Sequence, residues 1–123
     1  MDRGTDRRRK FGAAPENVQA VRSFVREMAS QSGADPDVAA LLASELAANA
    51  VVHANSVFEV RVRTDGDVFR VEIVNDAPEM IAALKEPSEE SGRGLHIVDA
   101  LSKHWGTEAY DHEKAVWFEL PTA

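Results

Sequence analysis

The spacing of apolar residues changes along this chain, and the order of the changes limits the possible folds. From about residue 14 to 31, and again from 36 to about 54, apolar residues recur at helical spacing. Residues 57–63 and 69–73 alternate between apolar and polar side chains, which is typical of half-buried strands. A short helix after Gly94 and two strands, near residues 104–110 and 114–120, complete the pattern. This order predicts an α+β fold, a two-layer sandwich in which helices cover one face of a mixed, mostly antiparallel sheet.

Short local signals predict where several of these elements begin and end. Asp35 followed by Pro36 is typical of a helix start, with Asp35 as N-cap and Pro36 in the first helical position. Pro15 suits the first turn of the preceding helix, and Gly33 suits its end. Asp65-Gly66 lies between the first two predicted strands and indicates a hairpin turn.

Length and composition exclude several classes of protein. The chain has 123 residues, which suits one domain with a single core. It has no cysteine, so a disulfide scaffold, a thiolate metal site and a cysteine nucleophile are excluded. We find neither an apolar run of about 20 residues nor a secretory signal, and we therefore expect a cytoplasmic protein that does not enter a membrane.

Charge is distributed unevenly. Residues 1–10 carry five basic and two acidic side chains, whereas the net charge of the whole chain is −7, so residues 11–123 carry −10. Because DNA affinity depends on neutralising phosphates, so acidic a body does not favour direct nucleic-acid binding. We expect residues 1–10 to form a basic, flexible tail and residues 11–123 to form the single domain.

The segment from Asp76 to Ser91 fits neither helix nor strand. It contains Pro78, Pro87 and a polar run over residues 86–91. A connection this long in so small a domain is usually a functional lid or a disordered stretch. We expect a lid at about residues 77–91.

The second predicted helix carries polar residues within its apolar stripe. At about 100° per residue, Glu45 and Asn49 fall in this stripe and stack one turn apart, and His53 continues their row. An unpaired carboxylate that faces a core is strongly disfavoured. Either a hydrogen-bonded Glu–Asn pair lies inside the core, or this face of the helix lines a cavity. The apolar residues that define the stripe are Val38, Leu41, Leu42 and Val52.

Two further signals follow along the chain. Asn75-Asp76 ends a predicted strand, where an aspartate either caps a turn or serves a site. Gly92-Arg93-Gly94 directly precedes a helix, either as a plain loop or as a segment whose backbone approaches an anion at the helix start.

Together, these segments resemble the motifs of a known superfamily. Residues 42–54 resemble the N-box of the GHKL ATPases, the gyrase, heat-shock chaperone, histidine-kinase and mismatch-repair type. Residues 71–76 and 91–99 resemble the two glycine boxes of that superfamily. The endings His104-Trp105-Gly106 and 115–120 are similar to those of its stand-alone branch, the anti-sigma-factor serine/threonine kinases of bacterial partner-switching systems. The resemblance covers residues from about 11 to 120.

The resemblance implies a Bergerat fold that binds ATP with Mg²⁺ between the helix layer and a lid. It implies that Asn49 ligates Mg²⁺ through its amide oxygen, which is a hard ligand of the kind that Mg²⁺ prefers. Asp76 would accept a hydrogen bond from the adenine amino group. Glu45 would be the catalytic residue that orients or deprotonates the attacking hydroxyl.

The resemblance also assigns residues around the nucleotide. The backbone amides near Gly92 and Gly94 would wrap the phosphates. Arg93 either neutralises phosphate charge or points outward. By position in the motifs, three further residues would border the nucleotide: His53, Pro78 and Leu95.

The implied function is that of an anti-sigma factor. It would be a protein serine/threonine kinase that phosphorylates an anti-anti-sigma (STAS) antagonist, sequesters a sigma factor and forms homodimers, as the branch commonly does. One departure favours an alternative, a non-catalytic nucleotide-binding switch module. The first glycine box usually continues Asp-x-Gly, whereas here Asp76 is followed by Ala77, Pro78 and Glu79. A third interpretation, the catalytic domain of a sensor histidine kinase, lacks a dimerisation helix pair with a phosphoacceptor histidine.

Overall fold

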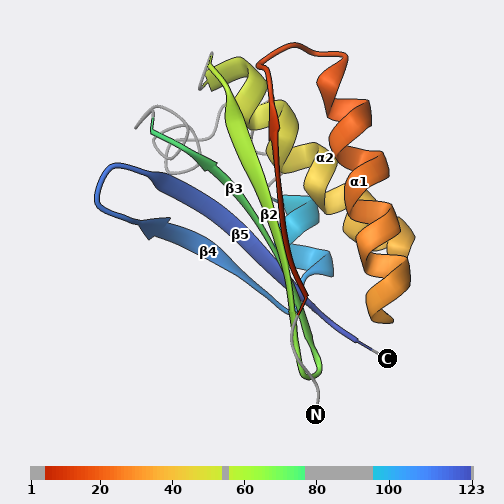
Figure 1. Cartoon of the computed structure of the whole chain (residues 1–123). Helices are drawn as coiled ribbons and strands as arrows, with labels where there is room; N and C mark the ends of the chain where they lie inside the picture. Colours follow the sequence, from red (N-terminus) through yellow and green to blue (C-terminus); the bar gives the residue numbers. More distant parts are fainter. Residues whose placement is uncertain (1–4, 54–55, 77–95, 123) are drawn as a thin grey trace.

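Five strands and two long helices build the structure, a computed structural model that describes residues 5–53, 56–76 and 96–122 (Figure 1). Residues 96–101 form a further short helix, as expected after Gly94. The main elements, in chain order, are β1 (Thr5–Phe11), α1 (Asn17–Ser32), α2 (Pro36–His53), β2 (Phe58–Asp65), β3 (Val68–Asn75), β4 (His104–Ala109) and β5 (Lys114–Pro121).

The strands form one sheet in the order β1-β2-β3-β5-β4, and every neighbouring pair is antiparallel. Figure 1 shows α1, α2 and the helix at residues 96–101 on the same side of this sheet. The predicted two-layer α+β sandwich is therefore confirmed. The sheet is antiparallel throughout its described strands rather than mixed.

The local signals acted largely as expected. The Oδ1 oxygen of Asp35 accepts hydrogen bonds from the backbone N–H groups of Asp37 at 3.0 Å and Val38 at 3.1 Å, which confirms it as the N-cap of α2. Gly33 ends α1 with a φ of 86°, and Gly66 turns the β2–β3 hairpin with a φ of 62°. These are left-handed conformations that favour glycine. Pro15 differs from the prediction, since it lies in a turn before α1, where its carbonyl accepts the N–H of Val18 at 3.2 Å.

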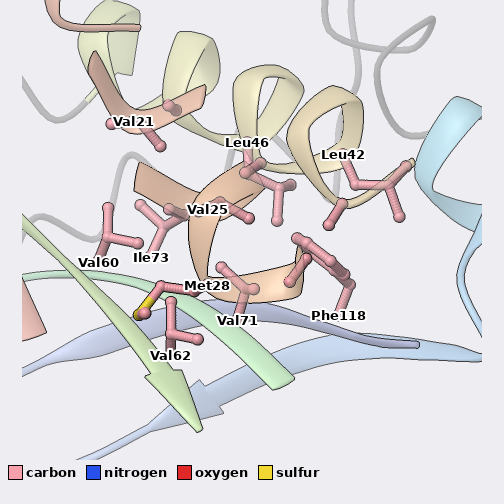
Figure 2. Packing of buried hydrophobic residues seen from close by; sticks show 14 of the residues in the cluster. Val21, Val25, Met28, Leu42, Leu46, Val60, Val62, Val71, Ile73 and Phe118 are labelled. Carbon is pink, nitrogen blue, oxygen red and sulfur yellow. The ribbon is translucent and has the colours of Figure 1, made fainter. Parts of the chain in front are cut away.

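The core lies between the two layers (Figure 2). Phe58, Val60 and Val62 of β2 are buried toward the helices, as their alternation predicts. Apolar residues of α1 and α2 meet them from the other layer. Figure 2 labels the residues at the centre of this packing: Val21, Val25, Met28, Leu42, Leu46, Val60, Val62, Val71, Ile73 and Phe118.

The basic N-terminal region is a strand, so the expectation of a flexible tail is wrong for residues 5–10. β1 pairs with the edge of β2 in a register that places Arg8 beside Arg61 and Phe11 beside Phe58. Phe11 is buried, its ring 5.9 Å from that of Phe58, and the guanidinium of Arg9 lies 5.3 Å from the Phe11 ring. Apolar anchoring and the free hydrogen-bonding edge of β2 thus order a segment whose charge suggested solvation.

The opposite face of the sheet carries ion pairs instead of a second helix layer. Arg61 pairs with Glu59 and Glu113. Arg70 pairs with Glu72 at 2.9 Å and with Glu119 at 3.1 Å. Burial lowers the pKa of both guanidinium groups, but the hydrogen bonds to these carboxylates more than offset it and raise each pKa. Both arginines therefore stay charged, and no helix within the described residues covers this face (Figure 1).

Candidate functional site

The polar residues of α2 lie beside the core and not within it. The buried face of α2 is formed by Leu42, Leu46 and five alanines: Ala39, Ala40, Ala43, Ala47 and Ala50. Glu45 and Asn49 are half-buried on the neighbouring face of the helix.

The predicted composition of the buried stripe is therefore wrong. Of its four apolar residues only Leu42 is buried, whereas Val38 and Leu41 are half-buried and Val52 is 66% exposed. The buried face is displaced around the helix from the predicted stripe, because alanines and not the bulkiest residues form most of it. The alternative of a Glu–Asn pair inside the core is not what the structure shows.

Glu45, Asn49 and His53 form one row along α2, since they follow one another at intervals of four residues. The Oδ1 oxygen of Asn49 is buried, and His53, the last residue of the helix, is half-buried. The row thus runs from the middle of α2 to its C-terminal end.

Asp76 lies at the end of the molecule where α2 also ends. It directly follows β3, whose end pairs with the start of β2 through Val74 and Glu59 (Figure 1). Its carboxylate is exposed, and it borders a hollow of about 650 Å³ that is also lined by Asn75 and Ser56. This hollow extends toward the ion-paired face of the sheet, and no residue of α2 is among its described lining residues. The structure therefore brings Asp76 and the α2 row to the same end of the sandwich but not into one enclosed pocket of described residues.

Five expected site residues lie outside the described residues: Pro78, Gly92, Arg93, Gly94 and Leu95. The expected lid at residues 77–91 lies outside them as well. Just beyond, Val98 of the short helix is buried, and Asp99 accepts a hydrogen bond from the indole N–H of Trp105 at 2.9 Å. Leu101 of the same helix is 46% exposed.

The oxygen atoms of the α2 row suit a metal ion that takes most of its ligands from water and from the substrate. Within the described residues, no cluster of three or more His, Cys, Asp or Glu side chains could hold a metal ion by itself. The amide oxygen of Asn49 and the carboxylate of Glu45 are hard donors one turn apart on α2. Mg²⁺ typically takes one or two protein ligands together with phosphates and water, so these residues fit Mg²⁺ bound with a nucleotide.

Asn75 also lies in this region, although the motifs assign no role to it. Asn75 is 5% exposed, and its Nδ2 group donates hydrogen bonds to Ser56 Oγ at 2.9 Å and to the carbonyl of Val57 at 2.7 Å. The alternation of side chains along β3 predicts that Asn75 is buried. Phe69, Val71 and Ile73 point toward the core, and Asn75 is the next residue with the same parity, so a polar residue was due at a buried position.

The family of this chain follows from its sequence as a whole. Residues 11–119 match the family model of the histidine kinase-like ATPase domain. The chain belongs to this family. The resemblance to the GHKL ATPases is thereby confirmed at the level of the superfamily, and the family implies ATP binding and an ATPase or kinase type of activity.

Solved structures agree on the fold of this histidine kinase-like ATPase domain. The histidine kinase AdeS of Acinetobacter baumannii matches with a TM-score of 0.59 at 11% sequence identity, over 94% of this chain and 68% of that chain. At this identity the likeness concerns the fold alone. No curated protein matches the chain significantly. Among the described helices, none combines the length and the apolar character needed to cross a membrane.

Proposed function

We propose that this histidine kinase-like ATPase domain is an anti-sigma factor with protein serine/threonine kinase activity, which phosphorylates an anti-anti-sigma (STAS) antagonist at the expense of ATP. The observation that carries the proposal is the row of Glu45, Asn49 and His53. It lies on a face of α2 beside the core and runs toward the end of the sandwich where Asp76 lies, in a chain of an ATP-binding family.

Asn49, Asp76 and Glu45 each have a distinct role in this proposal, and His53 would border the nucleotide. Asn49 would hold Mg²⁺ through its amide oxygen, and Asp76 would accept a hydrogen bond from the adenine amino group. When bound, Mg²⁺ neutralises phosphate charge. Glu45 takes the proton of the serine or threonine hydroxyl, the hydroxyl oxygen bonds to the γ-phosphorus, and the bond between that phosphorus and the bridging oxygen of ADP breaks.

Residues outside the described part of the chain complete the proposed site. As the resemblance implies, the backbone amides near Gly92 and Gly94 would contact the phosphates, and the start of the following helix would add its dipole. By the same resemblance, Arg93, Pro78 and Leu95 would border the nucleotide. The proposed partners, a sigma factor and a STAS antagonist, are supported by the resemblance of residues 104–106 and 115–120 to the stand-alone anti-sigma branch.

One observation favours a second candidate, a nucleotide-binding switch module without catalysis. Asp76 is followed by Ala77, Pro78 and Glu79 where the glycine box usually has a glycine. Proline fixes its own φ and restricts the residue before it, so this sequence has less backbone freedom than the usual Asp-x-Gly. Nucleotide binding would then control partner choice without phosphoryl transfer.

A titration with ATP, in the presence and absence of Mg²⁺, tests the binding shared by both candidates. We expect Mg²⁺ to increase the affinity of the native protein for ATP, and the Asn49→Ala variant to lose that increase. Gln19→Ala, on the exposed face of α1, is the matched control and should behave like the native protein. Absence of ATP binding in the native protein would contradict both candidates.

Transfer of labelled phosphate from ATP to candidate STAS antagonists separates the two. The kinase proposal requires labelling of a serine or threonine, and a Glu45→Ala variant that binds ATP but transfers phosphate at least about 100-fold more slowly, the lower end of the usual effect of a general base. ATP binding without any transfer by the native protein favours the switch module instead.

A further inference from the structure

Asn75 is a buried polar residue at the point where the chain leaves the sheet. Among the residues that the structure describes, it is the one polar or charged residue in the buried class. Burying an amide costs free energy unless its hydrogen-bonding groups find partners, so such a residue needs a structural or functional reason.

The contacts of Asn75 extend the sheet beyond its backbone pairing. The pairing of β2 with β3 ends at Glu59 and Val74, whereas on the other side Asn75 still pairs with Lys114 of β5. Its Nδ2 group donates to the carbonyl of Val57 at 2.7 Å and to Ser56 Oγ at 2.9 Å. The side chain thus takes the place of the next backbone contact and holds the last residue of β3 against the start of β2.

This attachment joins two parts of the candidate site. Ser56 lies three residues after His53, the end of the polar row on α2, and Asp76 is the residue directly after Asn75. Both amide hydrogens of Asn75 are used, and both go to the segment that leads out of α2. These bonds attach the backbone just before Asp76 to the start of β2, in addition to its pairing with β5.

We infer that Asn75 is a positioning residue of the nucleotide site, which sets the place from which Asp76 meets the adenine amino group; this inference rests on the proposed function. Asn75 does not touch the nucleotide. It acts on selectivity, because a hydrogen bond to a carboxylate depends steeply on the placement of that carboxylate. Its loss should weaken recognition of the amino group and leave recognition of the phosphates largely intact.

The test compares two nucleotides that differ only in the group that Asp76 would contact. Calorimetry with Mg²⁺ measures the dissociation constants of ATP and of purine riboside 5′-triphosphate, which is ATP without its 6-amino group. We expect the native protein to prefer ATP by at least about tenfold, as for a hydrogen bond to a charged group. Asp76→Ala should abolish this preference, and Asn75→Ala should remove most of it with little change in the affinity for the analogue.

Two further variants separate positioning from general destabilisation. Ile73→Val alters a buried residue of the same strand that points toward the core, so it should lower the melting temperature without changing the preference for ATP. Ser56→Ala removes one acceptor of the Asn75 amide at an exposed position that tolerates substitution, so it should fold and lose part of the preference.

The outcomes distinguish this inference from the function on which it rests. If Asp76→Ala loses the preference for ATP while Asn75→Ala and Ser56→Ala keep it, the positioning role is wrong and the proposed function stands. Equal loss of affinity for both nucleotides in Asn75→Ala also overturns the positioning role. If the native protein shows no preference for ATP over the analogue, the adenine contact of Asp76 fails, and the inference fails with it.

Discussion

The two long helices cover the same face of the sheet but differ in what they bury. α1 buries Val21, Val25 and Met28 and leaves polar residues toward solvent, as an ordinary amphipathic helix does. α2 buries mainly alanines together with Leu42 and Leu46, and places Glu45 and Asn49 at the edge of its buried face. Both helices thus contribute to the core, and α2 in addition presents the candidate site residues on its neighbouring face.

The largest effect on stability is expected from a substitution in the core, to which both helices contribute. Leu46 is 2% exposed, and Leu46→Ala should lower the free energy of unfolding by about 2–5 kcal/mol through lost burial and a cavity. Urea denaturation measures this change. Val18→Ala on α1, at a half-buried position, should cost clearly less, and equal losses would contradict the packing described for α2.

A substitution in the alanine-rich buried face of α2 should have the next largest effect, and it tests how this helix differs from α1. Ala43 is fully buried, so Ala43→Leu should overpack the interface and destabilise the fold by about 1–3 kcal/mol. Thermal denaturation provides the measurement. Ala48→Leu, on the exposed side of the same helix, is the control and should leave the melting temperature nearly unchanged.

The two helices also differ in how their N-terminal ends are capped. Asp35 caps α2 through two hydrogen bonds, whereas Glu16, at the N-cap of α1, makes no side-chain capping bond. Asp35→Ala should therefore cost about 1 kcal/mol of unfolding free energy. Glu16→Ala should cost almost nothing, and a larger loss there than at Asp35 would contradict the capping geometry.

The smallest effect on stability is expected on the face of α2 that carries the candidate site. Glu45→Gln keeps the size of a half-buried side chain outside the core, so the free energy of unfolding should change by no more than about 0.5 kcal/mol. On the proposed function the variant still binds ATP and loses phosphoryl transfer. Strong destabilisation would mean that Glu45 holds the fold together, and denaturation combined with the transfer assay distinguishes the two.

Local chemistry accounts for the parts of this protein that the sequence determines by itself. Asp35 and Pro36 start α2, Gly33 ends α1, and Asp65-Gly66 turns the hairpin, because each of these effects involves only a few neighbouring residues. The alternation of β2 and β3 likewise shows which side chains point inward. Element order then leads to the two-layer sandwich, and the motifs of residues 42–54 and 71–76 place Glu45, Asn49 and Asp76 as candidates.

Only the tertiary structure decided the remaining points, because each depends on residues far apart in the chain. β1 becomes a strand by pairing with β2 about fifty residues later, which no local charge pattern reveals. The buried face of α2 is chosen by the close approach that alanines permit, and not by its bulkiest residues. Asn75 holds β3 to the start of β2 across 18 and 19 residues of sequence. The periodicity of a helix or strand predicts which residues share a face. Which face meets the core depends on the other helices and strands that pack against it.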